Sequence, residues 1–521
     1  MPFIKIPSAY NTGLKPHIAY VEVDVSPGLH SFTIIGLADK SIGEAKDRVC
    51  AAMKNSGLIS PRQKNHNVIV SLTPSHAKKE GTSFDLAIAL GYLIATSQTN
   101  IILEETLVLG ELALNGSIRK IPGVLPMIIE ARNHGFKTVI LPHGNLEEAS
   151  LIPDMAFIGI SSLHSLIQGF QSTSRLETSD AAAMQTIHFT GEDSFSPDIA
   201  GIQGNENAKR AIQIAASGKH SLVLYGPPGS GKTSLIEAMS GVLPNLTKEE
   251  ILESTSIYSV AGELSNGPVT RPPIRAPHHT TTRIACIGGG SHPKPGEITL
   301  AHNGILFLDE LAEFKPDVLN ALRQPMESKS ISILRGGMTA SFPANFLLAG
   351  AMNPCPCGNF NSMTKHCTCT ISSIKKYLQK IPGPFIDRID MWVCVDAAKV
   401  QNDLGLDKLE MKRFASISSK EMRSAVEAAR SRQFLRSMEK FGCMKSNSDL
   451  TSSQVKATFE CDGEVRAMLD AAVSSLKLSN RGLFKVMKIA RTIADIEDSD
   501  SIKKEHLLEA LQYRPKIFDF S

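Results

Sequence analysis

The sequence predicts an α/β protein in which a parallel sheet occupies the middle of the chain, between an α+β region and a mostly helical region. Two short runs, 222–225 and 305–308, are apolar or aromatic at every position, which is typical of parallel strands covered on both faces. The eight residues 226–233 fit the phosphate-loop pattern G-x-x-x-x-G-K-[ST] between a strand and a helix. Beyond residue 396, apolar residues recur at helical spacing.

Composition favours a large globular chain of several domains. The 521 residues suffice for about three domains of about 150 residues, and 42% of them are hydrophobic. The longest apolar run, near 86–95, is shorter than the roughly 18–20 residues that span a bilayer. Nine cysteines is an odd number for a disulfide framework and the first residues show no secretory pattern, so we expect a cytoplasmic protein without a membrane partner. The net charge of +3 means that any nucleic-acid binding must come from local patches.

Residues 1–170 are expected to form a compact α+β domain. Alternating apolar residues predict strands at 18–25 and 68–72, and further strands are expected at 108–112 and 138–142. Helical spacing predicts helices at 40–54 and 84–95. Residues 171–197 are rich in Ser, Thr and Asp without a clear period, so we expect a linker.

The phosphate-loop pattern predicts which residues bind a nucleotide. They are Gly226, Pro227, Pro228, Gly229, Ser230, Gly231, Lys232, Thr233 and the following Ser234. Glycines let backbone N–H groups turn toward phosphate oxygens, and the helix N-terminus adds a partial positive charge. Lys232 is expected to reach the β- and γ-phosphates of ATP, and the Thr233 hydroxyl is expected to ligate Mg²⁺.

The apolar run 305–308 ends in two carboxylates, Asp309 and Glu310. In open α/β sheets, ligands bind at the carboxyl ends of the strands. We therefore expect Asp309 to hold Mg²⁺, directly or through water, and Glu310 to activate the attacking water. A further apolar run at 346–352 predicts a buried strand that ends at Asn353, whose neutral amide can orient that water.

Four thiols within 15 residues match the ligand count of a structural zinc site: Cys355, Cys357, Cys367 and Cys369. The C-x-C spacing is tighter than the usual C-x₂-C, His366 could replace one thiol, and four reduced cysteines without an ion are the alternative. The other cysteines are scattered and are expected to be small buried side chains (Cys50, Cys286, Cys394, Cys443 and Cys461). His278 and His279 are adjacent on a loop, where two side chains rarely face one ion.

Two stretches rich in Gly, Pro and basic residues, 271–280 and 288–297, cannot be regular helices and are expected to be exposed loops or hairpins. The alternating runs 330–335 and 338–342 flank Gly336 and Gly337, which predicts a β-hairpin. Residues 421–441 are expected to form a helix with Met422, Val426, Ala429, Leu435, Met438 and Phe441 on its apolar face.

Segments 79–86, 110–116 and 145–149 resemble the Lon-protease-like domain at the front of the ComM/YifB family of magnesium-chelatase-like AAA+ ATPases. Ser83 falls near the serine of the Lon proteases' Ser–Lys dyad. The lysine would fall near Leu125, where this sequence has none. Because a serine without its base is a weak nucleophile, the resemblance implies a non-catalytic scaffold domain.

The resemblance extends to an AAA+ core at 198–395 and a helical lid at 396–521. It implies that Asn353 is the first nucleotide sensor, that Arg388 in 384–390 is the arginine finger, and that Arg481 in 478–495 is the second sensor. Arg323 and Arg335 are rivals for the finger. Asn480 and Gly482 depart from the family's usual residues around the second sensor, but the arginine is kept.

For function, the resemblance implies a cytoplasmic AAA+ ATPase that works as a homo-oligomeric ring, most simply a hexamer. It further implies DNA helicase and branch-migration activity in recombination during natural transformation, on single-stranded, forked or branched DNA. The loop around Lys294 and the hairpin around Arg335 are then expected to contact DNA in the ring channel. The alternatives are a chelatase-type protein-remodelling motor with a partner subunit, and a Lon-like peptidase, which the missing lysine opposes.

Overall fold

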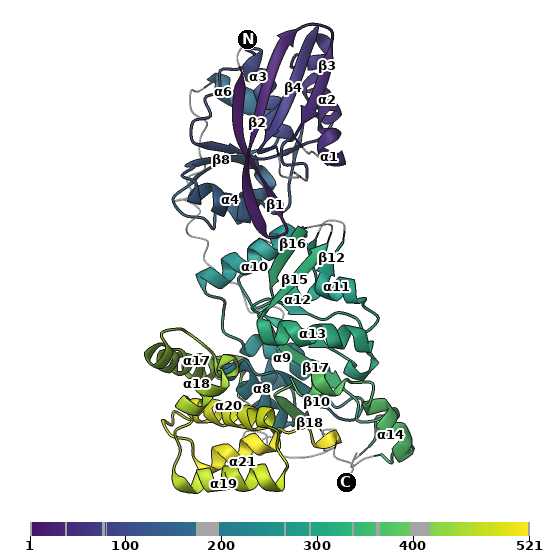
Figure 1. The fold of residues 1–521 in the computed structure, drawn as a ribbon, viewed down its shortest axis with the longest axis vertical. Coiled ribbons are helices and arrows are strands. Elements are labelled where there is room, and N and C mark those ends of the chain that lie inside the picture. Colours follow the sequence, from purple (N-terminus) through teal and green to yellow (C-terminus); the bar gives the residue numbers. More distant parts are fainter. Residues whose placement is uncertain are drawn as a thin grey trace, which may run out of the picture.

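The computed structural model describes residues 3–36, 39–75, 79, 81–172, 197–264, 267–290, 293–335, 338–360, 365–395 and 417–518. Three blocks follow one another along an elongated molecule: the N-terminal block at one end, a parallel sheet in the middle, and a helical block beside the sheet at the other end (Figure 1). The predicted α/β class is confirmed. Most of the expected linker (173–196) and the start of the expected lid (396–416) lie outside the described residues. No helix in the described ranges is long and apolar enough to cross a membrane.

The N-terminal block is built on a four-stranded sheet in the order β1-β2-β4-β3. Its strands are β1 (Ile4–Thr12), β2 (Lys15–Pro27), β3 (Ser31–Ile35) and β4 (His66–Thr73). Helix α3 (Asp85–Ala95) packs on β1 and β2 and is buried along almost its whole length. The single helix expected at 40–54 is two helices, α1 (Lys40–Gly43) and α2 (Ala45–Asn55), and Gly43 at the break has low helix propensity.

A parallel three-stranded sheet, β5-β8-β9, completes the N-terminal block. The strand expected at 108–112 is split, because the backbone of Gly110 bonds to Ser83 and Leu86 at the start of α3 instead of to a strand. The elements are β5 (Thr106–Val108), β6 (Glu111–Leu112), β7 (Ile118–Arg119), α4 (Val124–Asn133), β8 (Thr138–Pro142), α5 (Leu146–Ala149), β9 (Ala156–Ile160) and α6 (Leu163–Ser172).

The middle block is a five-stranded parallel sheet in the order β11-β14-β17-β10-β18. One face packs on α8 (Glu206–Gly218) and α9 (Lys232–Val242), and the other on α13 (Pro316–Ser328) and α14 (Ile371–Leu378). Alternate residues of β10, β14, β17 and β18 enter the two cores, so these strands lack charged residues, as the sequence predicted for 222–225, 305–308 and 346–352. The edge strand β11 carries the charged Arg275. The strands are β10 (Leu222–Tyr225), β11 (Ile274–Arg275), β14 (Ile305–Leu308), β17 (Leu347–Met352) and β18 (Met391–Cys394).

Two hairpins leave this sheet toward the N-terminal block (Figure 1). The first is β12 (Gly288–Gly289) with β13 (Lys294–Pro295), and the second is β15 (Ser330–Arg335) with β16 (Met338–Pro343). The two lie against each other, since a Cβ on Gly288 would come within 3.3 Å of Ile333. The tip at Gly336 and Gly337 lies outside the described residues. The short helices α11 (Arg283–Ile287) and α12 (Glu297–Leu300) precede and follow the first hairpin. A third short helix, α15 (Gly383–Ile386), precedes β18.

The helical block packs on the α8–α9 face of the sheet. Its helices are α17 (Ser419–Phe441), α18 (Ser452–Thr458), α19 (Gly463–Ser475), α20 (Asn480–Ile496) and α21 (Lys504–Gln512). On α17, Met422, Val426 and Ala429 are buried as expected, but Leu435 and Met438 are 66% and 51% exposed. The expected apolar face is therefore wrong at Leu435 and Met438. The buried face of α17 continues instead through the polar Gln433 and Ser437, and Phe441 packs half-buried against the same core.

Helix α10 (Lys248–Ala261) joins the N-terminal block to the sheet block. The Gly123 N–H donates to the carbonyl of Ser259 over 2.9 Å, and Lys120 Nζ donates to the carbonyl of Leu264 over 2.7 Å. The buried Glu148 carboxylate accepts hydrogen bonds from Ser259 of α10 and from Asn145. The buried Ser259 hydroxyl of α10 thus has its hydrogen-bond partner, Glu148, on the other side of this seam.

We expect Glu148→Ala to destabilise this seam, because it leaves the buried Ser259 hydroxyl without its acceptor and removes one of the two acceptors of the Asn145 amide, which keeps the Ile121 carbonyl. An unsatisfied buried polar group costs about 1–3 kcal/mol. The measurement is the urea midpoint of the unfolding transition that includes the N-terminal block. The matched control is Glu147→Ala, which removes an exposed carboxylate one residue earlier. Equal midpoints for the two variants would contradict the role of Glu148 in stabilising the seam.

Candidate active site

The phosphate-loop residues lie at the carboxyl edge of the sheet, directly after β10. Gly226 passes so close to the end of β18 that a Cβ there would meet the Val395 carbonyl oxygen at 2.0 Å, so only glycine fits. Lys232 is the first residue of α9. Its Nζ donates to the carbonyls of Gly226 and Pro227 over 2.9 and 2.8 Å. Burial lowers the pKa of Lys232, and the nearby Asp309 charge opposes that shift.

The ends of two neighbouring strands bring the other predicted groups to the same edge. The Thr233 hydroxyl lies 3.3 Å from Asp309 Oδ2, at the end of β14. Asn353 follows β17, and its Oδ1 lies 3.4 Å from Lys232 Nζ. A hydroxyl and a carboxylate oxygen this close are the ligand types that Mg²⁺ takes beside phosphate oxygens. Thr233 and Asp309 therefore fit the magnesium site that the sequence predicts.

Glu310 projects from the same edge with a strained backbone. Its φ of 53° and ψ of 46° lie in the left-handed region, which non-glycine residues adopt rarely and often at functional sites. The side chain is 58% exposed, and its Oε2 lies 3.4 Å from His279 Nδ1. His278 bonds instead to Thr280. The adjacent histidines thus have different partners, and His279 adds a neighbour to Glu310 that the sequence did not indicate.

Arg388 lies at the opposite edge of the sheet. It precedes β18, which pairs in parallel with β10 so that Met391 lies opposite Leu222. The phosphate loop follows the other end of β10. Four strand residues rise about 13 Å, so Arg388 and Lys232 are on opposite edges of one subunit. Two hydrogen bonds hold the Arg388 segment there: the Asp390 N–H donates to Ser221 Oγ over 2.8 Å, and Ser221 Oγ donates to Asp390 Oδ2 over 3.1 Å.

Asp390 carries a charge that helps to fix this edge. Although burial would raise the pKa of Asp390, the imidazole of His220, whose Nδ1 lies 3.7 Å from Asp390 Oδ2, and the charges of Lys485 and Lys488 hold it well below its usual range. Asp390 therefore stays ionised near neutral pH, next to the segment that carries Arg388.

Arg481 lies beside Arg388, and both pair with one carboxylate. Glu327 Oε1, from α13, is 2.9 Å from Arg388 Nη2 and 2.7 Å from Arg481 Nη2. The three residues line a cavity of about 350 Å³ together with Lys485 and Lys488. The structure thus groups the predicted finger and second sensor with each other, and Lys232 does not line this cavity. Arg323, a rival for the finger, lies on α13 one turn before Glu327 and is half-buried.

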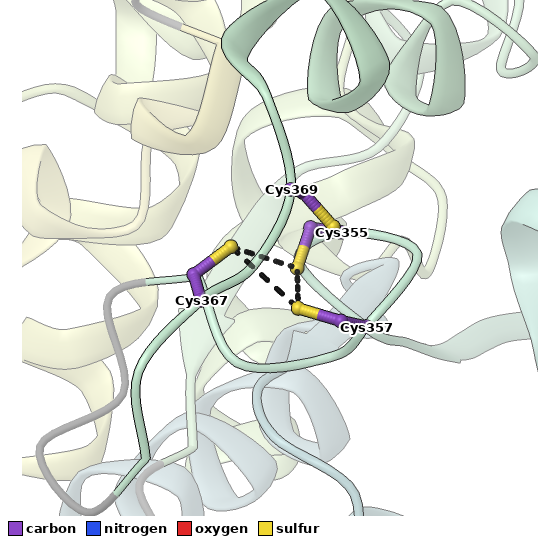
Figure 2. Close-up of side chains that lie close together, drawn as sticks. All are labelled: Cys355, Cys357, Cys367 and Cys369. Atoms are coloured by element: carbon purple, nitrogen blue, oxygen red, sulfur yellow. Dashed lines mark hydrogen bonds between the residues drawn. The ribbon is translucent and has the colours of Figure 1, made fainter.

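The four predicted zinc ligands form a compact sulfur cluster (Figure 2). The Sγ atoms of Cys355, Cys357 and Cys367 are 3.4, 3.7 and 3.6 Å apart, and all four Sγ atoms lie within 4.8 Å of one another. Zn–S bonds of about 2.3 Å in a tetrahedron put sulfur atoms about 3.8 Å apart, so the four thiols fit such an ion. Among the described residues this is the sole metal-compatible cluster, and His366 is outside it.

Backbone N–H groups favour the thiolate at Cys357, whereas burial raises the pKa of Cys355 to about 12. Hydrogen bonds from Asn359 and Thr368 lower the pKa of Cys357 to about 5. The expectation that the remaining cysteines are buried is correct for Cys50 and Cys286, but Cys394 is exposed at the end of β18. Cys443 and Cys461 are half-buried.

The residues expected to bind DNA lie on the two adjacent hairpins. Lys294 is exposed on β13 and lines a cavity of about 310 Å³ at the seam with the N-terminal block, which Ser83 also lines. Arg335 is the last residue of β15. The Ser83 hydroxyl donates to the carbonyl of Ala9 over 2.9 Å, and Leu125, at the position of the missing lysine, is fully buried in an apolar core.

Comparison with protein families gives matches along most of the chain. The model described as "Magnesium chelatase, subunit ChlI" matches residues 198–403. "Subunit ChlI of Mg-chelatase" matches 21–145, and "Magnesium chelatase, subunit ChlI C-terminal" matches 416–514.

Curated proteins also align with nearly the full chain. Competence protein ComM of Haemophilus influenzae is 36% identical over 513 residues, 98% of this chain and 97% of that protein. The YifB protein of Escherichia coli is 38% identical over 499 residues, 95% of this chain and 93% of that protein. Lon protease 2 of Bacillus subtilis is 27% identical over 139 residues, 25% of each chain.

Proposed function

Because the chain belongs to the ComM/YifB family of magnesium-chelatase-like AAA+ ATPases, we propose that it is a ring-forming, ATP-driven DNA motor. Its proposed role is helicase and branch-migration activity in homologous recombination during natural transformation. The name of the Haemophilus influenzae relative, Competence protein ComM, supports the biological setting. The observation that carries the motor mechanism is the separation of Lys232 from the Arg388–Arg481 pair across one sheet.

Within one subunit, the carboxyl edge of the sheet binds and hydrolyses ATP. Lys232 and the loop N–H groups hold the phosphates, while Thr233 and Asp309 hold Mg²⁺. Held there, Mg²⁺ would neutralise charge that develops on the phosphates. Glu310 accepts the proton of the attacking water, and Asn353 orients that water against the γ-phosphate.

The other edge of the sheet completes the site of a neighbouring subunit. Arg388 cannot reach the nucleotide of its own chain, because the sheet lies between them. In a closed head-to-tail ring, each subunit presents a different surface to each neighbour, so every phosphate loop meets an Arg388 edge. We assign Arg388 and Arg481 together to the neighbour's γ-phosphate. We take the ring to be a hexamer, and the N-terminal block to be a non-catalytic scaffold fixed on α10.

DNA contact is assigned to the two adjacent hairpins, through Lys294 and Arg335. The near-neutral total charge is compatible with this, because a few cations per subunit are multiplied around a ring. Contacts to phosphates carry no sequence information and weaken steeply with salt, since each neutralised phosphate releases counterions.

A second candidate is a protein-remodelling motor that acts with a partner subunit. Three matches to family models described for a magnesium chelatase subunit favour it. The two candidates share the ATPase site and differ in what stimulates it.

The DNA motor predicts that forked and four-way DNA stimulate ATP hydrolysis at low salt, and that Lys294→Ala and Arg335→Ala lose most of this stimulation. Both variants should keep their oligomeric state and their DNA-free ATPase rate. The control Glu310→Gln should bind ATP and hydrolyse it at a rate at least about a hundredfold lower, with or without DNA, because it lacks the general base. If no DNA stimulates ATP hydrolysis by the wild type, the partner-dependent motor is favoured instead.

A shared active site predicts complementation between inactive chains. Lys232→Ala loses nucleotide binding, while Arg388→Ala and Arg481→Ala each keep binding and lose hydrolysis. Mixing Lys232→Ala with Arg388→Ala chains should restore part of the hydrolysis, since some interfaces then hold both an intact loop and an intact arginine pair. Mixing Arg388→Ala with Arg481→Ala should restore much less, because both residues belong to the same edge. If the second mixture recovers as much hydrolysis as the first, Arg388 and Arg481 do not share a role at one edge.

A further inference from the structure

The cysteine cluster and the phosphate loop are in direct contact. Gly358, in the loop that carries the cysteines, has a φ of +79°, and a Cβ on it would meet Pro228 Cδ at 2.6 Å. Pro228 is the third residue of the phosphate loop. The backbone of the cysteine loop therefore lies directly on the loop that receives the nucleotide.

A second connection runs through the chain itself. Cys355 is two residues after Asn353, whose side-chain oxygen lies 3.4 Å from Lys232 Nζ. Just before Asn353, the carbonyl of Met352 accepts the Gly226 N–H over 3.2 Å. The first cysteine thus directly follows a segment that is bonded to both ends of the phosphate loop.

Little regular structure supports the cysteine loop. Neither 353–360 nor 365–370 contains a helix or a strand. Its internal bonds include Gly358 N–H to the Cys355 carbonyl, at 2.9 Å, and Phe360 N–H to Cys355 Sγ, at 3.3 Å. Both bonds converge on Cys355, so the position of Gly358 depends on how Cys355 is held. Four thiolates this close repel one another unless a cation lies between them.

We propose that the four cysteines hold Zn²⁺, and that this ion keeps the phosphate loop in the shape that binds nucleotide. The ion fixes Cys355 and Cys357, these fix Gly358 against Pro228, and Cys355 anchors the segment that carries Asn353. Nucleotide affinity is then metal-dependent, although the ion contacts no nucleotide. This inference rests on the proposed assignment of ATP to the phosphate loop.

The test uses the full-length protein, with zinc content and the affinity for a fluorescent ATP analogue as its two measurements. Wild type and the control Cys443→Ser should each hold about one zinc per chain and bind the analogue alike. Cys357→Ser, and wild type stripped with a strong chelator, should lose zinc and bind the analogue at least tenfold more weakly. Added Zn²⁺ should restore the stripped wild type only.

Gly358→Ala tests the contact separately, because it keeps all four thiols. It should retain zinc and still bind the analogue several-fold more weakly, since its methyl group meets Pro228. Zinc-free wild type that is folded by circular dichroism and binds the analogue with unchanged affinity would overturn the inference. So would wild type without zinc, or Gly358→Ala with normal affinity. Failure of zinc-loaded wild type to bind the analogue would instead overturn the proposed function.

Discussion

The polarity of the parallel sheet is the constraint on which the rest of the site depends. Because all five strands run in one direction, the segments that follow β10, β14 and β17 meet at one edge and bring Lys232, Asp309 and Asn353 together. The segment that precedes β18 must lie at the other edge, and it carries Arg388. On the proposed assignment, a single subunit therefore carries two halves of a catalytic site that face apart, and association is the direct way to join them.

In the single subunit, Glu327 pairs with both arginines of the proposed second half. Two guanidinium groups side by side repel each other, and one carboxylate between them offsets that repulsion at 2.9 and 2.7 Å. The γ-phosphate is also an anion that pairs well with arginine. A neighbour's nucleotide can therefore take the place of Glu327 without leaving either arginine unpaired. Partial burial of Arg388, 13% exposed, makes the ionic partner more important than it would be in water.

Local chemistry explains what the sequence could predict. The phosphate loop, the carboxylates after the apolar run 305–308, and the four close cysteines are each contained in one short segment, so their pattern indicates their chemistry. Glu327 and His279 could not be found this way, because their roles depend on partners 61 and 31 residues away in the chain, Arg388 and Glu310. Periodicity likewise predicted an apolar face on α17, but the face that the fold buries also carries the polar Gln433 and Ser437, so the exposure of Leu435 and Met438 was missed.

The central claim is that each active site is shared between two subunits. The most direct measurement is a cryo-EM structure of the assembled protein with Mg²⁺ and a non-hydrolysable ATP analogue. Our account predicts that Arg388 and Arg481 both lie within hydrogen-bonding distance of the γ-phosphate held by Lys232 of the adjacent subunit, and that neither remains paired with Glu327. A structure in which both arginines stay on Glu327 while the nucleotide site is filled, or in which Arg481 contacts the nucleotide of its own chain, would contradict it.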